Sequence, residues 1–270
     1  MSTGTPIPPA DKHRHWTNFR RELGKLCRKI RAPRGVRELP PKWPQDFGAF
    51  TRQLCEQVLP YTMTSKERLA TIETATRYVV QNQIPGAFVE SGVGPGGSMM
   101  AVAYTLLEMK VTDRDLFLYD TYAGMDAPTD ADVSILGKAA KRKYDSKLKD
   151  GVSTWNYFPL AEVRANMQRT GYPSERTQLI KGLVQNTLPA NDIESIALLR
   201  LDTNLYESTK VEMAELFPKL SPGGVLIIDD YNRWLGQRKA VDDYLAQFGA
   251  GMLLTRIDDH CVQGVKRTTK

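Results

Sequence analysis

Short apolar segments that alternate with helical stretches dominate the chain from about residue 47 onward. The helical stretches include residues 98–108, 161–170 and 209–217. The apolar segments, which have the length of buried strands, are residues 87–90, 116–120, 177–181, 196–202 and 225–229. Strands that are joined through helices pair in parallel, so this alternation predicts an α/β, doubly wound fold with a mostly parallel sheet.

Two further signals frame that sheet. Thr64 and Glu67 have the spacing of a capping box and predict the start of a helix. Residues 252–257 and 261–266 flank only three residues, which is hairpin spacing. We therefore expect a seven-stranded sheet with a terminal antiparallel hairpin.

The basic charge of the chain is concentrated at its N-terminus. The 270 residues include 37 Lys and Arg against 31 Asp and Glu, a net charge of +6. Ten of the basic residues and two of the acids lie within residues 1–37, so the rest of the chain carries a charge of −2. We expect residues 1–45 to be a basic N-terminal arm and linker and residues 46–270 to be the folded domain. A mildly acidic domain argues against a nucleic-acid partner.

The arm has an apolar stripe within residues 16–30 and an arginine-rich opposite face. Such a helix packs on its own domain or a sister subunit, or lies on an anionic membrane as a peripheral contact. The chain has no apolar run long enough for a transmembrane segment or a signal peptide. Its three cysteines have unrelated spacings, which fits a reducing, cytoplasmic location.

A glycine-rich turn follows the first strand candidate. Gly92, Gly94 and Gly97 satisfy the dinucleotide pattern G-x-G-x-x-G, which is the basis for an alternative function as an NAD(P)-dependent oxidoreductase. Asp120 ends the next strand, where an acid can bind ribose hydroxyls. Glu90 ends the first strand and would repel a dinucleotide's phosphates. An acid there suits a cationic ligand such as a sulfonium.

Carboxylates also end the last two parallel strand candidates. Asp202 follows one, and Asp229 and Asp230 follow the other. In the usual doubly wound order these strands are neighbours of each other and of the first strand, so the three acids converge near the glycine turn. Three carboxylates repel one another unless a hard cation joins them, and an oxygen-only set suits Mg²⁺.

Several segments together resemble the macrocin O-methyltransferase family. They span roughly residues 61–244 in order and spacing, and include Val89-Glu90-Ser91-Gly92, Leu199-Arg200-Leu201-Asp202 and Asp229-Asp230-Tyr231. The resemblance implies a class I methyltransferase-like domain over residues 46–270, in a homo-oligomer. It implies an S-adenosylmethionine-dependent, Mg²⁺-assisted O-methyltransferase whose partner is a small-molecule hydroxyl acceptor, a sugar-bearing natural product or a glycolipid.

The resemblance also assigns residues by position. Asp202, Asp229 and Asp230 match metal ligands, and we expect Asp202 and Asp230 to be catalytic because a metal held there would lower the pKa of the acceptor hydroxyl. The matches to cofactor contacts are Met63, Glu90, Gly92, Ser98, Asp120, Thr121, Gly182 and Leu183.

The chain departs from the family at the general base. Some members have an aspartate two residues beyond the first metal ligand, where this chain has Asn204, and others use a lid histidine, whereas no histidine lies between His15 and His260. The remaining candidate bases are Asp126, Asp130 and Asp132. Asn204 therefore keeps two alternatives open: a more acidic, phenolic acceptor, and a cofactor-binding homologue with impaired catalysis.

Residues 138–149 interrupt the alternating pattern as a long insertion. They contain six Lys and Arg and a single acid before Asp150, namely Asp145. Such a run is typical of a solvated helix face. Because the family places a lid over the acceptor here, recognition of an anionic substrate is the alternative.

Overall fold

The computed structural model describes residues 43–248 and 252–267. Residues 46–270 form one compact unit. The predicted apolar stripe and the basic residues of the N-terminal arm lie outside the described residues, so their roles stay predictions. No helix in the described ranges has the length and apolar character needed to cross a bilayer.

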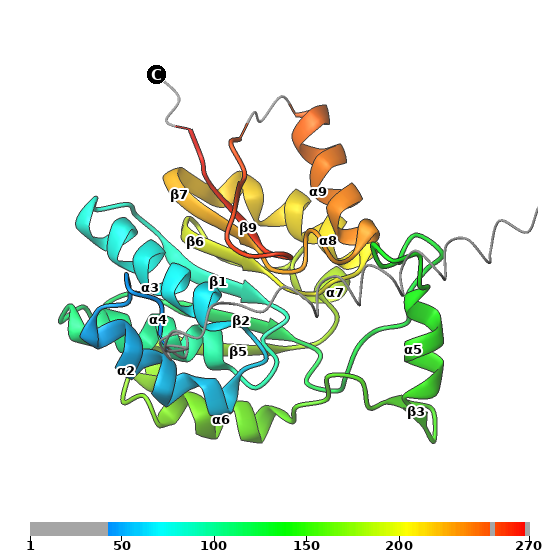
Figure 1. The fold of residues 1–270 in the computed structure, drawn as a ribbon, viewed down its shortest axis with the longest axis horizontal. Helices are drawn as coiled ribbons and strands as arrows, with labels where there is room; N and C mark the ends of the chain where they lie inside the picture. The colour runs from blue at the N-terminus through cyan, green and yellow to red at the C-terminus, as the bar shows by residue number, and fades with distance from the viewer. Residues whose placement is uncertain (1–42, 249–251, 268–270) are drawn as a thin grey trace, which may run out of the picture. The chain divides into compact units, whose positions relative to one another are not determined.

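A seven-stranded sheet forms the centre of this unit (Figure 1). Its order is β5-β2-β1-β6-β7-β9-β8, with β9 antiparallel to β7 and to β8 and all other pairs parallel. The predicted mostly parallel sheet with a terminal antiparallel hairpin is confirmed. The strand bounds are β1 Ala87–Ser91, β2 Leu116–Asp120, β5 Thr177–Lys181, β6 Ile196–Leu201, β7 Leu220–Ile228, β8 Thr255–Arg256 and β9 Val262–Val265.

Helices pack in two groups against this sheet (Figure 1). The first group is α2 Ala49–Val58, α3 Lys66–Gln81, α4 Gly97–Glu108 and α6 Leu160–Gln168. The second is α7 Val184–Thr187, α8 Tyr206–Glu215 and α9 Leu235–Gln247. Short 3-10 helices complete the chain at η1 Leu59–Tyr61, η2 Ser174–Arg176 and η3 Phe217–Lys219.

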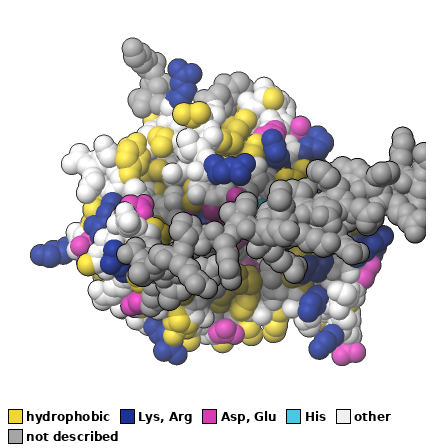
Figure 2. All heavy atoms as spheres, viewed as in Figure 1, with side chains coloured by type: hydrophobic (Ala, Val, Ile, Leu, Met, Phe, Trp, Pro, Cys, Tyr) yellow, Lys and Arg dark blue, Asp and Glu magenta, His cyan; other side chains and the backbone are white. Residues whose placement is uncertain are grey.

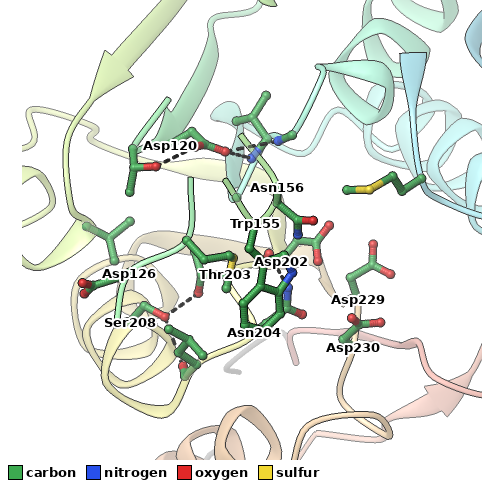
Figure 3. A pocket seen from close by; sticks show the side chains of 18 of the residues that line it. Asp120, Asp126, Trp155, Asn156, Asp202, Thr203, Asn204, Ser208, Asp229 and Asp230 are labelled. Carbon is green, nitrogen blue, oxygen red and sulfur yellow. Dashed lines mark hydrogen bonds between the residues drawn. The ribbon is translucent and has the colours of Figure 1, made fainter. Parts of the chain in front are cut away.

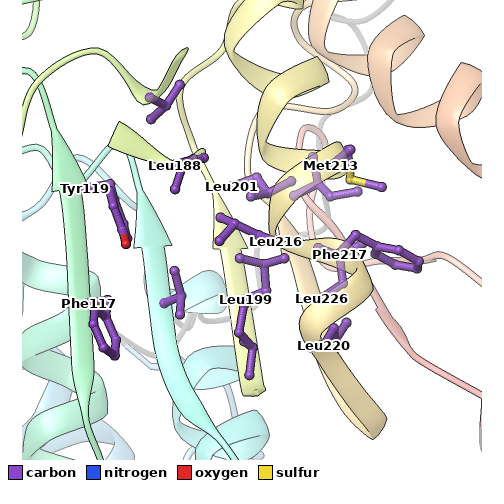
Figure 4. Packing of buried hydrophobic residues seen from close by; sticks show 14 of the residues in the cluster. Phe117, Tyr119, Leu188, Leu199, Leu201, Met213, Leu216, Phe217, Leu220 and Leu226 are labelled. Atoms are coloured by element: carbon purple, nitrogen blue, oxygen red, sulfur yellow. The ribbon is translucent and has the colours of Figure 1, made fainter. Parts of the chain in front are cut away.

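The main core cluster shows how strand alternation separates the two helix groups (Figure 4). Side chains at alternate strand positions, such as Leu199 and Leu201 of β6, pack with Met213 and Leu216 at α8 and its end. The preceding strand residue, Leu198, is also buried and points to the other face, because successive strand side chains alternate. Both faces of the sheet are therefore covered, as expected of a doubly wound fold.

The insertion after β2 forms its own small structure. It contains α5 Ala140–Ser146 and a two-stranded hairpin of β3 Leu148–Lys149 and β4 Val152–Ser153. A separate apolar cluster of Ala140, Trp155 and Trp234 holds it. Figure 2 shows that Lys and Arg side chains are scattered among acidic and apolar ones on the face of the molecule that is turned toward the viewer.

The predicted start of α3 is wrong by one residue. Ser65, not Thr64, caps α3: its hydroxyl accepts the backbone N–H of Arg68 at 3.2 Å. The Thr64 hydroxyl instead donates to Asp229 at 3.3 Å. Two adjacent hydroxyl residues precede the helix, and the sequence alone does not show which one tertiary contacts will use.

Candidate active site

One pocket lies at the carboxyl ends of the parallel strands (Figure 3). Seven of the eight predicted cofactor contacts line it, together with Asp202, Asp229 and Asp230. Those seven are Met63, Gly92, Ser98, Asp120, Thr121, Gly182 and Leu183. The structure thus brings together residues that are up to 167 positions apart in the chain.

The glycine turn forms one wall of this pocket. Gly92 has φ +82°, and a Cβ there would lie 2.4 Å from the carbonyl oxygen of Asp202. The backbone of the turn therefore packs directly against the end of β6, and only glycine fits at this position. A Cβ at Gly94 would meet nothing closer than Met63 Cε at 3.9 Å. The backbone at Gly94 is therefore open to a ligand, and α4 begins directly behind it.

Asp120 links the end of β2 to that turn. One carboxylate oxygen accepts the backbone N–H groups of Val93 at 2.8 Å and Gly94 at 3.1 Å, and the other accepts that of Tyr122 at 2.9 Å. Burial nevertheless raises the pKa of Asp120, against these hydrogen bonds. The carboxylate holds the turn in shape and still lines the pocket.

Glu90 is the predicted contact that the structure does not place on the pocket wall. Its side chain is fully buried at the end of β1 and forms an ion pair with Arg200 of β6. One of its carboxylate oxygens has no hydrogen-bond partner. Burial raises the pKa of Glu90 to about 8. Its ion-pair partner, Arg200, does line the pocket.

The three aspartates at the ends of β6 and β7 are ion-paired with arginines. Arg200 lies 3.0 Å from Asp202 and also contacts Asp229. Arg68 of α3 contacts Asp229 and lies 3.5 Å from Asp230. Arg68 and Arg200 therefore supply positive charge where the sequence predicted a metal ion.

These residues match a hard divalent cation in kind and in charge. The donors are carboxylates only, as Mg²⁺ prefers. Burial raises the pKa of Asp202 to about 7 and also raises the pKa of Asp230. Burial therefore disfavours the ionised carboxylates, and a bound cation would stabilise them. In the present side-chain conformation, however, no group of three or more His, Cys, Asp or Glu in the described ranges is arranged to hold a metal. Mg²⁺ could bind here only if Arg68 and Arg200 moved away from the aspartates.

Comparison with known proteins identifies the kind of enzyme that carries this pocket. The family model for macrocin O-methyltransferase (TylF) matches residues 40–265. The chain belongs to the macrocin O-methyltransferase family. This membership decides between the two interpretations of the glycine turn in favour of methyl transfer and against an NAD(P)-dependent oxidoreductase.

Individual relatives of this macrocin O-methyltransferase homologue agree. Demethyldecarbamoylnovobiocin O-methyltransferase of Streptomyces niveus is 33% identical over 198 residues, which cover 73% of this chain and 72% of that protein. A tetracenomycin 4'-O-methyltransferase of Streptomyces olivaceus, whose substrate is named as a dimethoxy-rhamnosyl derivative, has the same identity and coverage. The solved structure of the O-methyltransferase NovP superposes with a TM-score of 0.68 at 29% identity, covering 77% of this chain and 83% of that one. The predicted class I methyltransferase fold is thereby confirmed.

The structure separates the candidate general bases. Asp126 lines the pocket, whereas Asp130 is exposed and does not line it. Asp132 is buried and holds the insertion in place, because its carboxylate accepts the backbone N–H groups of Thr129 and Tyr206, each at 2.7 Å. His260 lies in the β8–β9 turn and does not line the pocket.

Asn204, two residues beyond Asp202, lines the pocket. It is buried and has φ +69°, a conformation that asparagine tolerates better than most residues. Its amide nitrogen donates to the carbonyl oxygen of Asp202 at 3.4 Å, and its Oδ1 has no hydrogen-bond partner. That oxygen is buried, so an acceptor hydroxyl would reach it only after the side chain turned toward the pocket, and the amide cannot take the proton in either case.

Several pocket residues carry little or no signal in the sequence. Arg68 and Trp155 carried no motif of their own, and Arg200 was noted only as part of the family resemblance. A charged residue inside an apolar strand is a signal of a buried ion pair, and Arg200 fits that pattern. Trp155 and Trp234, whose ring centroids are 6.0 Å apart, come from segments that only the fold brings together.

Proposed function

We propose that this enzyme is an S-adenosylmethionine-dependent, Mg²⁺-assisted O-methyltransferase that acts on a hydroxyl of a sugar-bearing natural product or glycolipid. The observation that carries the proposal is the single pocket in which the glycine turn, Asp120 and the 182–183 segment meet the three aspartates. Relatives named for glycosylated antibiotics support a sugar hydroxyl as the acceptor.

The cofactor occupies the part of the pocket between the glycine turn and β5 in this proposal. Asp120 accepts the ribose hydroxyls, the 182–183 backbone borders the adenine, and Gly94 lets the ligand approach the main chain. The cofactor supplies a methyl group already activated on a sulfonium. The task of the protein is therefore to align an acceptor oxygen with that methyl group and to remove its proton.

Asp202, Asp229 and Asp230 are the residues that would hold Mg²⁺. The ion supplies Lewis-acid polarisation of the acceptor hydroxyl when bound. Its entry requires Arg68 to turn away from Asp229 and Asp230, and Arg200 to turn away from Asp202 and Asp229. Arg68 can do so without losing all its partners, because Asp258 holds its guanidinium through contacts of 2.6 and 3.0 Å.

Asp126 is the general base of this proposal. It is the one of the three loop acids predicted from the sequence that faces the pocket. Asn204 positions the acceptor by accepting its hydroxyl hydrogen bond. Trp155 and Trp234 border the acceptor end of the pocket and exclude water from it.

A phenolic acceptor is the second candidate. Asn204 favours it specifically, because a phenol has a pKa near 10 and needs less help from a base than a sugar hydroxyl does. The other alternative, a homologue with impaired catalysis, predicts cofactor binding without turnover.

Methyl transfer to a panel of glycosides and phenols, with and without EDTA, tests the proposal. We expect turnover of at least one glycoside that EDTA suppresses and Mg²⁺ restores. Turnover unaffected by EDTA would contradict the metal role, and S-adenosylhomocysteine binding with no turnover of any acceptor would favour the impaired homologue.

A further inference from the structure

The pocket has a cationic corner that the proposed chemistry does not use. Lys143 of α5 and Arg233, which follows β7, both line the pocket. Lys143 belongs to the basic run of residues 138–149, and it is the member of that run that reaches the pocket. Lys141, by contrast, pairs with Asp145 on the helix surface, at 2.9 Å.

The Lys143 ammonium lacks a carboxylate partner among the described residues, where its recorded contact is the face of Trp155, 4.3 Å from the ring centroid. Arg233 is 3.8 Å from Asp230, a loose contact, and its side chain is 49% exposed. Burial and the nearby charge of Arg233 both lower the pKa of Lys143. Lys143 and Arg233 thus lie close enough to repel each other, and Asp230, the carboxylate that acts on both, already has Arg68 at 3.5 Å.

The position of Lys143 is fixed by packing. Ala140 of the same helix is buried against Trp155 and Trp234, and Tyr144 packs on that cluster. A short helix that is held by its own apolar cluster presents Lys143 to the pocket in a defined place. If residues 138–149 were only a solvated helix face, Lys143 would project into water and would not line the pocket.

We propose that Lys143 and Arg233 form a subsite for an anionic group on the acceptor, so that the substrate is a sugar carrying a phosphate or a carboxylate. The proposal rests on the proposed function, because the subsite adjoins the acceptor end of the same pocket. The anion relieves the repulsion between the two side chains, and the fixed distance from this corner to the aspartates selects which hydroxyl of the sugar reaches the methyl group.

Calorimetric titration of the full-length protein, saturated with S-adenosylhomocysteine, tests the subsite. The probes are rhamnose 1-phosphate, methyl glucuronide and neutral methyl rhamnoside, so that phosphate and carboxylate sources are distinguished. We expect an anionic probe to bind about tenfold or more tightly than the neutral one, equivalent to about 1.4 kcal/mol. Its affinity should fall as NaCl rises.

Matched variants separate the subsite from general electrostatics. Lys143→Gln and Arg233→Gln should each remove most of the preference for the anionic probe, and Lys143→Arg should keep it. Lys149→Gln makes the same change in net charge outside the pocket and should leave the preference intact.

Three outcomes would overturn the subsite and leave the proposed function standing. The neutral and anionic probes could bind equally tightly, or neither anionic probe could bind. Alternatively, Lys143→Gln and Lys149→Gln could lose the same amount of preference for the anionic probe. Failure of the wild-type protein to bind S-adenosylhomocysteine would overturn both.

Discussion

Individual side chains decide whether this pocket can perform catalysis. If Asp126 is the base, Asp126→Asn should lower kcat by about 10²- to 10⁴-fold and flatten the pH–rate profile, because the amide cannot accept the proton. Asp130→Asn, a neighbouring exposed acid outside the pocket, is the control and should keep wild-type activity. A large rate gain in Asn204→Asp together with an unchanged Asp126→Asn would show that the site lacks a base.

Glu212 should make stability depend on pH. Its side chain is fully buried in α8, and burial raises its pKa from the ordinary 4.5 to about 8. Between these values the unfolded chain releases a proton that the folded chain keeps, so the free energy of unfolding falls as pH rises from about 4.5 to 8. Glu212→Gln should therefore raise Tm more at pH 8.5 than at pH 5, and the exposed Glu194→Gln should not. Equal shifts at both pH values would contradict this.

At the residue scale, the sequence located what lies at strand ends and missed what long-range contacts assemble. Asp120, Asp202 and Asp229 follow apolar strands, and the topology of parallel sheets brings such positions together. Arg68 pairs with Asp229 across 161 positions, and a single sequence carries no signal for that contact. The sequence likewise carries no signal that Glu90 pairs with Arg200, so Glu90 was expected to line the pocket, which it does not.

Among the elements, the glycine turn is the most constrained. Gly92→Ala places a Cβ against the Asp202 carbonyl oxygen at positive φ, so we expect lost stability and weaker binding of S-adenosylhomocysteine. Gly137 also has positive φ, but a Cβ there meets nothing within 4 Å. Gly137→Ala should thus lose about 1–2 kcal/mol of stability at most and keep cofactor affinity. Similar cofactor affinities in the two variants would show that the close approach at Gly92 does not matter.

Strand positions were predictable because apolar runs of five or six residues between turn signals have the length of buried strands and are shorter than most helices. Residues 116–120 and 177–181 coincide with β2 and β5. The early start of β7 at Leu220 was missed, because Pro222, Gly223 and Gly224 suggest a turn. The cap of α3 was misplaced because Thr64 contacts Asp229, a tertiary interaction that overrides a local pattern.

In the whole molecule, an ion-pair network ties the terminal hairpin to the start of α3. Asp258 accepts two contacts from Arg68, the Ser65 hydroxyl at 2.9 Å and two backbone N–H groups of its own turn. Asp258→Asn should cost about 1–3 kcal/mol in urea unfolding, because the guanidinium loses its charged partner. The adjacent exposed Asp259→Asn should cost little. If Asp258→Asn left the free energy of unfolding unchanged, the ion pairs of Arg68 with Asp229 and Asp230 would be sufficient to stabilise its guanidinium.

The order of the sheet followed from the alternation of strands and helices, whereas the role of the basic arm, residues 1–45, stays a prediction. The central claim is that the pocket binds the cofactor of a methyltransferase. Equilibrium titration of the wild-type protein with S-adenosylhomocysteine and, separately, with NAD tests it most directly. The account predicts saturable binding of S-adenosylhomocysteine, weakened in Gly92→Ala, and no binding of NAD. Binding of NAD in preference to S-adenosylhomocysteine would contradict it.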